Sequence, residues 1–139
     1  MELNLGCGHL SDDEFVAGFE ECTISPAAFH HADHLRLAWI YAGRYDAEEA
    51  EEKLLAEIRR FAAKAGVPEK FRYTMTVAWF RLVATSRKNS KAENTFGEWI
   101  ASHPEFLDRR RLEKYYSEDK LLGEPACTSW VPGDLAPLS

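Results

Sequence analysis

Histidines are concentrated in one short stretch of this 139-residue sequence, which holds three of its five histidines. The stretch reads Phe29-His30-His31-Ala32-Asp33-His34-Leu35-Arg36. On a helix, His31 and His34 lie one turn apart and share a face. A neutral imidazole titrates near neutral pH and is also the commonest side-chain metal ligand. We therefore predict that His31 and His34 are catalytic, either in acid/base chemistry or as ligands of a divalent transition metal.

A catalytic metal needs a third protein ligand, and the sequence does not single one out. His9 lies near the N-terminus, and His103 directly precedes a proline. The other candidates have no spacing that selects one of them: Cys22, Glu20, Glu21 and Asp13. The metal interpretation therefore depends on the tertiary structure.

Five further residues are predicted to contact a ligand. Arg36 or Arg72 would hold an anionic group, because a guanidinium pairs with carboxylates and phosphates. Tyr41 continues the helical stripe of the histidine pair and would line a pocket. Tyr73 and Thr76 follow Arg72 where a second apolar segment begins, and their hydroxyls either line that pocket or cap the helix.

A structural role for the histidines is the competing interpretation. Side chains at a helix start bond free backbone groups, and Asp33 in the first turn favours the positive end of the helix dipole. The protein would then be a non-catalytic helical binding or interaction domain. The run Arg109-Arg110-Arg111 has the composition of a phosphate patch, but its acidic neighbours favour a solvated face. Whether the protein is an enzyme stays open at this point.

The overall composition excludes several classes of protein. The sequence has 17 Lys and Arg against 23 Asp and Glu, a net charge of −6, which disfavours nucleic acid as a partner. No apolar run approaches the roughly 18 residues of a membrane span. The three cysteines have no paired spacing and fit reduced thiols, so we expect a cytoplasmic protein. The oligomeric state does not follow from the sequence.

Hydrophobic periodicity and capping signals predict helices throughout. Ser11 with Glu14, and Asp46 with Glu49, have the spacing of helix N-caps, and Gly43 and Gly66 are expected to end the second and third helices. The polar run 86–91 is expected to be a loop. The predicted helices cover residues 11–22, 31–42, 46–65, 72–85, 94–101 and 106–116.

These segments predict an all-α protein, a compact single-domain bundle of five or six helices. Residues 1–10 are expected to be flexible and residues 11–123 to form the helical domain. Residues 124–139 contain three prolines and are expected to form an irregular tail packed on the domain through Trp130 and Val131.

Three blocks of the sequence resemble a group of small uncharacterised bacterial proteins that have them in the same order. The blocks are residues 29–39, residues 74–79, and Tyr115-Tyr116-Ser117 together with Val131-Pro132. The resemblance implies no particular activity. In similar sequences a His-Glu pair commonly occupies the positions of Arg72 and Tyr73, so a site completed by that pair would here have an arginine as its positive charge.

Overall fold

The computed structural model describes residues 10–25, 27, 29–90 and 94–137, and this part of the chain is helical and contains no strand. The all-α prediction is confirmed. Five helices of seven or more residues occur in the described part, close to the predicted number. They are α1 (Asp12–Glu20), α2 (His31–Arg44), α3 (Ala47–Lys64), α4 (Tyr73–Asn89) and α5 (Phe96–Ser102), followed by the short α6 (Glu118–Leu122) and α7 (Glu124–Thr128). Three 3-10 turns connect them: η2 (Pro68–Lys70), η3 (Pro104–Leu107) and η4 (Arg109–Lys114).

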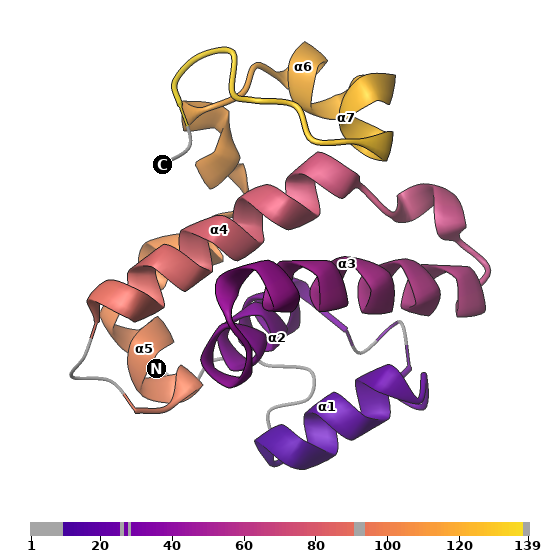
Figure 1. Cartoon of the computed structure of the whole chain (residues 1–139), viewed down its shortest axis with the longest axis vertical. Coiled ribbons are helices and arrows are strands. Elements are labelled where there is room, and N and C mark those ends of the chain that lie inside the picture. The colour runs from indigo at the N-terminus through magenta and orange to yellow at the C-terminus, as the bar shows by residue number, and fades with distance from the viewer. Residues whose placement is uncertain (1–9, 26, 28, 91–93, 138–139) are drawn as a thin grey trace.

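Helix α2 lies at the centre of the fold. Nine of its fourteen residues are buried, as expected for a helix that is apolar nearly all round. It packs most extensively on α4 and then on α3. Helices α3 and α4 cross the molecule one above the other, with α1 below them and α6 and α7 above α4 (Figure 1).

The predicted N-caps are present. The hydroxyl of Ser11 accepts from the N–H of Glu14, and the Glu14 carboxylate accepts from the N–H of Ser11. The carboxylate of Asp46 accepts from the N–H of Glu49 at 2.9 Å. Gly66 follows the end of α3 with φ of +80°, a conformation that glycine adopts without strain. These local signals need only neighbouring residues, which explains why the sequence reveals them.

The predicted end of α2 at Gly43 is wrong, because α2 continues to Arg44. Gly43 lies inside the helix where the Arg87 side chain crosses it, and a Cβ at this position would lie 2.3 Å from a guanidinium nitrogen. Arg87 donates to the carbonyl of Trp39 at 2.8 Å, and its guanidinium lies 3.6 Å from the centre of the Trp39 ring. Gly43 therefore permits a close approach between helices.

The loop expected over residues 86–91 is wrong for residues 86–89, which form the last turn of α4. Ser90 follows the helix, and residue 91 lies outside the described residues. Two of these side chains, Ser86 and Arg87, have partners on other helices. The hydroxyl of Ser86 accepts from Trp99 Nε1 at 3.0 Å, and Arg87 reaches α2 as described above. Contacts from distant segments thus extend the helix past its apolar stripe.

The C-terminal segment is partly helical. Pro125 occupies the first turn of α7, where its missing N–H has no intrahelical partner to lose, so the prolines of the segment do not prevent a helix there. Residues 129–137, which we call the tail loop, have no regular structure. Residues 1–9, on which the prediction of a flexible N-terminus falls, lie outside the described residues.

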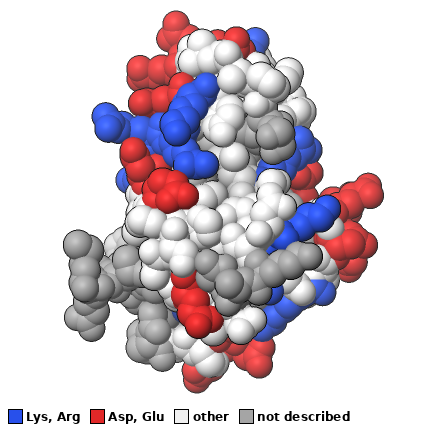
Figure 2. Space-filling model, turned by 90° about the vertical axis from the view of Figure 1, so that its left-hand side faces the viewer, with Lys and Arg blue, Asp and Glu red and all other residues white. Residues whose placement is uncertain are grey.

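None of the described helices is long and apolar enough to cross a lipid bilayer. On the face drawn in Figure 2, the described Lys and Arg residues are interspersed with Asp and Glu around uncharged surface and form no continuous basic stripe.

Candidate functional site

The histidine cluster lies at the start of α2, as the sequence predicts. His30 has extended backbone and precedes the first helical residue, and its N–H donates to the Asp33 carboxylate at 2.9 Å. The second oxygen of that buried carboxylate, Oδ1, has no hydrogen-bond partner in the described part of the chain. Asp33 thus fixes the helix start that positions His31 and His34.

His31 is partly buried between α4 and η3. Its Nε2 donates to the carbonyl oxygen of Phe106 at 3.0 Å, because a carbonyl can only accept. Its ring meets the ring of Trp79 edge-on, with 4.7 Å between the ring centres. Desolvation by burial is the main reason that the pKa of His31 is lowered, so the ring is neutral at pH 7 with its lone pair on Nδ1.

His34 is exposed, although protein atoms are dense around its ring. Its ring meets Phe29 edge-on at 4.4 Å between centres. Desolvation by the surrounding protein is the largest cause that lowers the pKa of His34 to about 4, followed by the charges of His31 and Arg109. His34 is therefore a neutral base at pH 7 that water and solutes reach.

Arg109 is a site residue that the sequence-based interpretation assigned to a solvated face. It begins η4 and is exposed, and its charge lowers the pKa of both His31 and His34. The hydrogen bond from His31 to Phe106 joins η3 to the start of α2, and Phe106 lies three residues before Arg109. No local sequence signal links residues 109 and 31. We call His31, His34 and Arg109 the histidine site.

The donor set for a transition metal is incomplete among the described residues, where no three His, Cys, Asp or Glu side chains converge. Two of the candidate third ligands are engaged elsewhere: Glu20 accepts from Tyr41, and Asp13 pairs with Arg44 at 2.6 Å. The two imidazoles also contact different neighbours, Trp79 and Phe29. His9 lies outside the described residues. A metal at His31 and His34 stays a prediction without a third ligand.

Arg36 occupies a structural position in the fold. It is 6% exposed, and its Nη2 donates to the carbonyl of Leu10 at 2.7 Å and to the carboxylate of Asp12 at 2.9 Å. Its guanidinium also lies over the ring of Phe15 at 4.6 Å. These contacts tie α1 to α2 and leave a ligand-binding role for Arg36 without geometric support.

Tyr41 is fully buried, and its hydroxyl donates to the carboxylate of Glu20 at 2.5 Å. Burial is the largest cause that raises its pKa, with the Glu20 carboxylate adding to it. Lys53 pairs with the same carboxylate at 3.5 Å. The structure therefore places Tyr41 in an internal polar network with Glu20 and Lys53.

The three residues at the start of α4 also contact protein groups. Nη1 of Arg72 lies against Sγ of Cys127 on α7, and the Thr76 hydroxyl donates to the Arg72 carbonyl at 2.7 Å within its own helix. Tyr73 packs on the hydrophobic core. The structure thus does not bring Arg72, Tyr73 or Thr76 to the histidine site.

Comparisons with known proteins identified no homologue of this chain. No family model, curated protein or solved structure matches the chain. The resemblance in three blocks therefore carries no residue roles, and the chemistry of the histidine site is argued from its own contacts.

Proposed function

We propose that this protein binds a small anionic molecule at the histidine site and that His34 acts there as a general base. The observation that carries the proposal is an exposed imidazole, neutral at pH 7, within the electrostatic reach of an exposed arginine. An uncharged base beside a fixed cation suits a ligand that brings a negative charge and gives up a proton. In the described part of the chain, the side chains of His34 and Arg109 form no hydrogen bond or ion pair with other residues.

Arg109 supplies the charge that would hold the ligand. A guanidinium offers two parallel N–H donors to a carboxylate or phosphate. After desolvation and the charge of His31, the same charge also lowers the pKa of His34 in the free protein, because an imidazolium near it is repelled. An anion bound to Arg109 would cancel this repulsion. Binding of the anion would then raise the proton affinity of His34, so that His34 can accept a proton from the bound molecule.

His31 is a positioning residue in this proposal. Its Nε2–H donates to the Phe106 carbonyl, which joins η3 to α2 and fixes the tautomer of the ring. His34 takes a proton from the bound molecule onto a ring nitrogen and becomes an imidazolium. The negative charge left on the ligand is stabilised by Arg109 and by the new cation. The proton returns to the product or to water in the reverse step.

A non-catalytic helical domain is the second candidate function. The observation that favours it is the contact set of His31, which bonds a backbone carbonyl and packs on Trp79 as a structural side chain would. In that case both histidines only join α2 to its neighbours. Replacing them would then lower stability and change nothing else.

Proton NMR of the histidine rings in a phosphate titration tests the proposal. Inorganic phosphate is expected to raise the pKa of His34 in the wild type. Arg109→Gln should raise the pKa of His34 without phosphate, because a repelling charge is gone, and should weaken the response to phosphate. Arg110→Gln is the matched control, since Arg110 is the neighbouring exposed arginine and pairs with Asp108 at 3.7 Å.

The outcomes separate the two candidates. A His34 signal that phosphate does not move, together with loss of stability in His34→Gln, supports the structural alternative. Equal responses from the Arg109→Gln and Arg110→Gln proteins would remove Arg109 from the site and contradict the proposal.

A further inference from the structure

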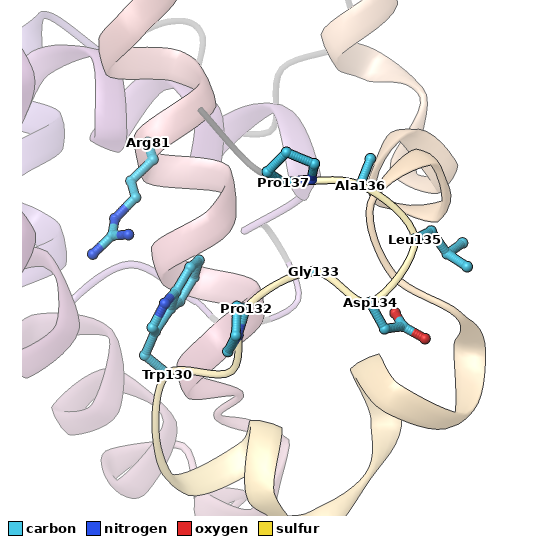
Figure 3. A pocket seen from close by; sticks show the side chains of 8 residues that line it. All are labelled: Arg81, Trp130, Pro132, Gly133, Asp134, Leu135, Ala136 and Pro137. Carbon is cyan, nitrogen blue, oxygen red and sulfur yellow. The ribbon is translucent and has the colours of Figure 1, made fainter.

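A hollow of about 410 Å³ lies between α4 and the tail loop, and none of the residues of the histidine site lines it. Arg81 and Trp130 form one side, and residues 132–137 curve around the other (Figure 3). Its walls combine the indole of Trp130 and the rings of Pro132 and Pro137 with a single cationic side chain. This combination offers a flat apolar surface beside one cationic group, and Asp134 is the acidic residue of the lining.

The tail loop that frames the hollow is held by specific hydrogen bonds. The hydroxyl of Tyr116 donates to the Val131 carbonyl at 2.6 Å, and the N–H of Leu135 donates to the Tyr115 carbonyl at 2.9 Å. Ser117 donates to the Asp134 carboxylate through its N–H at 2.8 Å and its hydroxyl at 2.7 Å. The hollow is therefore preformed, and a ligand does not have to order it.

Glycine is required at one point of this loop. A Cβ on Gly133 would lie 2.3 Å from the Ala136 carbonyl oxygen and 2.7 Å from the Tyr115 carbonyl oxygen. Both are backbone atoms that cannot move independently of the loop. The close turn at Gly133 thus belongs to the same constraint that keeps the hollow open.

Arg81, which lines the hollow, retains hydrogen-bonding capacity beside the ring of Trp130. Its guanidinium lies 4.3 Å from the centre of the Trp130 ring, and its Nε donates to Glu51 Oε1 at 2.9 Å. Its Nη2 reaches Glu51 Oε2 at 3.5 Å. Glu51 thus occupies the Nε–Nη2 side, while Nη1 has no partner among the described residues and 42% of the Arg81 side chain is exposed. The Nη1–Nη2 edge remains available to a second carboxylate.

The other nearby carboxylate does not compete for that edge. Asp134 points to the outside of the tail loop, away from Arg81, as does the exposed side chain of Leu135 (Figure 3). Its carboxylate is occupied by Ser117. Glu51 is then the one described acidic group that pairs with Arg81.

We propose that this hollow binds a small aromatic carboxylate, with the aromatic ring against Trp130 and the prolines and the carboxylate on the Nη1–Nη2 edge of Arg81. The indole and the pyrrolidine rings provide flat apolar area for the ring. The guanidinium, already oriented by Glu51 and by its stacking on Trp130, provides a paired contact for the carboxylate. Neither group alone defines the ligand. The combination selects a molecule that carries both.

Two-dimensional NMR of the indole N–H of Trp130 tests this proposal on the full chain. The signal is assigned by its loss in Trp130→Phe. Benzoate is the probe, benzamide keeps the ring without the charge, and acetate keeps the charge without the ring. Benzoate is expected to shift the Trp130 signal saturably, and both partial probes should bind at least about tenfold more weakly, the effect of roughly 1.4 kcal/mol.

Two substitutions act in opposite directions. Arg81→Gln should weaken benzoate binding by at least about tenfold, which again corresponds to roughly 1.4 kcal/mol. Glu51→Gln should strengthen it, because a competing negative charge is removed, and a gain of affinity cannot result from misfolding. Arg110→Gln, a change at an arginine whose side chain is 78% exposed, is the control that should leave binding unchanged.

Several results would overturn the proposal. Benzoate that leaves the Trp130 signal unmoved contradicts a site in the hollow. Acetate or benzamide binding as tightly as benzoate contradicts recognition of both groups. If the Arg81→Gln protein binds benzoate with wild-type affinity, Arg81 does not contact the ligand. The outcome is independent of the histidine site, since the two sites share no residue.

Discussion

The start of α2 and the tail loop differ in how their polar groups are used. The start of α2 has the residue types of an active site. Arg36 and Tyr41, on the same helix, nevertheless form hydrogen bonds with other residues of the protein. The tail loop has the composition of an unstructured end, yet side chains from α4 and from residues 115–117 hold it in place. The hollow of about 410 Å³ lies beside the tail loop.

This difference shows that residue type alone does not indicate availability. A buried arginine or tyrosine must satisfy its hydrogen bonds inside the protein, because an unpaired buried polar group costs free energy. Such residues therefore tend to become structural. An irregular backbone exposes groups of its own and leaves concave surface, provided that other segments fix it. Four sets of measurements test this difference between the two regions.

The largest effect is expected for Thr74→Val, which tests whether the tail loop is an integral part of the fold. The buried hydroxyl of Thr74 donates to the Ser129 carbonyl at 2.6 Å and accepts from the Val131 N–H at 3.0 Å. Loss of the Thr74 hydroxyl leaves the Ser129 carbonyl and the Val131 N–H unpaired. The free energy of unfolding should therefore fall by about 2 to 4 kcal/mol in urea titrations. Thr76→Val is the control, because that hydroxyl bonds only within its own helix. Equal losses in the two variants would mean that the loop is not anchored.

Arg36→Met tests the region at the start of α2. It keeps most of the side-chain volume and removes the hydrogen bonds to Leu10 and Asp12, which should cost about 2 kcal/mol of stability by thermal or urea unfolding. Arg109→Met, at an exposed position, should cost less than about 0.5 kcal/mol. If Arg36→Met were as stable as Arg109→Met, Arg36 would be available for a ligand and the contrast between the two regions would disappear.

Gly43→Ala measures the close contact inside α2. Alanine in an exposed helix normally stabilises by up to about 1 kcal/mol over glycine. Here the new Cβ displaces the Arg87 guanidinium from Trp39, so we expect no gain and a loss of up to about 1 kcal/mol. Gly97→Ala in α5, where the nearest neighbouring atom lies 3.9 Å away, should show the normal gain. The same gain at Gly43 would show that Arg87 does not depend on this glycine.

The response of stability to pH should also differ, because the two regions titrate in different windows. The pKa of His34 is lowered from 6.5 to about 4 by folding, so the unfolded chain binds more protons between these values, and stability falls as the pH drops through this window. His31 acts in the same direction. The hydrogen bonds from Ser117 lower the pKa of Asp134 below 3.8, so its contribution is lost only as the pH falls below that value.

Urea titrations between pH 7 and pH 3 check both windows. His34→Gln should flatten the fall in stability between pH 6.5 and pH 4 and leave the lower range unchanged. Ser117→Ala should flatten the range below pH 3.8 instead. An unchanged slope in His34→Gln would contradict a neutral His34 in the folded protein.

Local patterns in the sequence determined the helices and most of their starts. A cap such as Ser11 with Glu14, or Asp46 with Glu49, is complete within four residues, and the periodicity of α2 already indicates its central place. The all-α class and the helical setting of His31 and His34 follow from such patterns. Nothing beyond neighbouring residues is needed to form them.

Contacts between distant segments decided the rest. Arg87 crosses α2 at Gly43, Thr74 bonds the tail loop 55 and 57 residues away, and the link from His31 to Phe106 spans 75 residues and joins η3 to the start of α2. These long-range contacts decide which polar side chains form hydrogen bonds inside the protein and which can still bind a ligand. The sequence reveals the types of the residues, whereas burial, distance and charge in the folded chain decide what chemistry each of them has left to do.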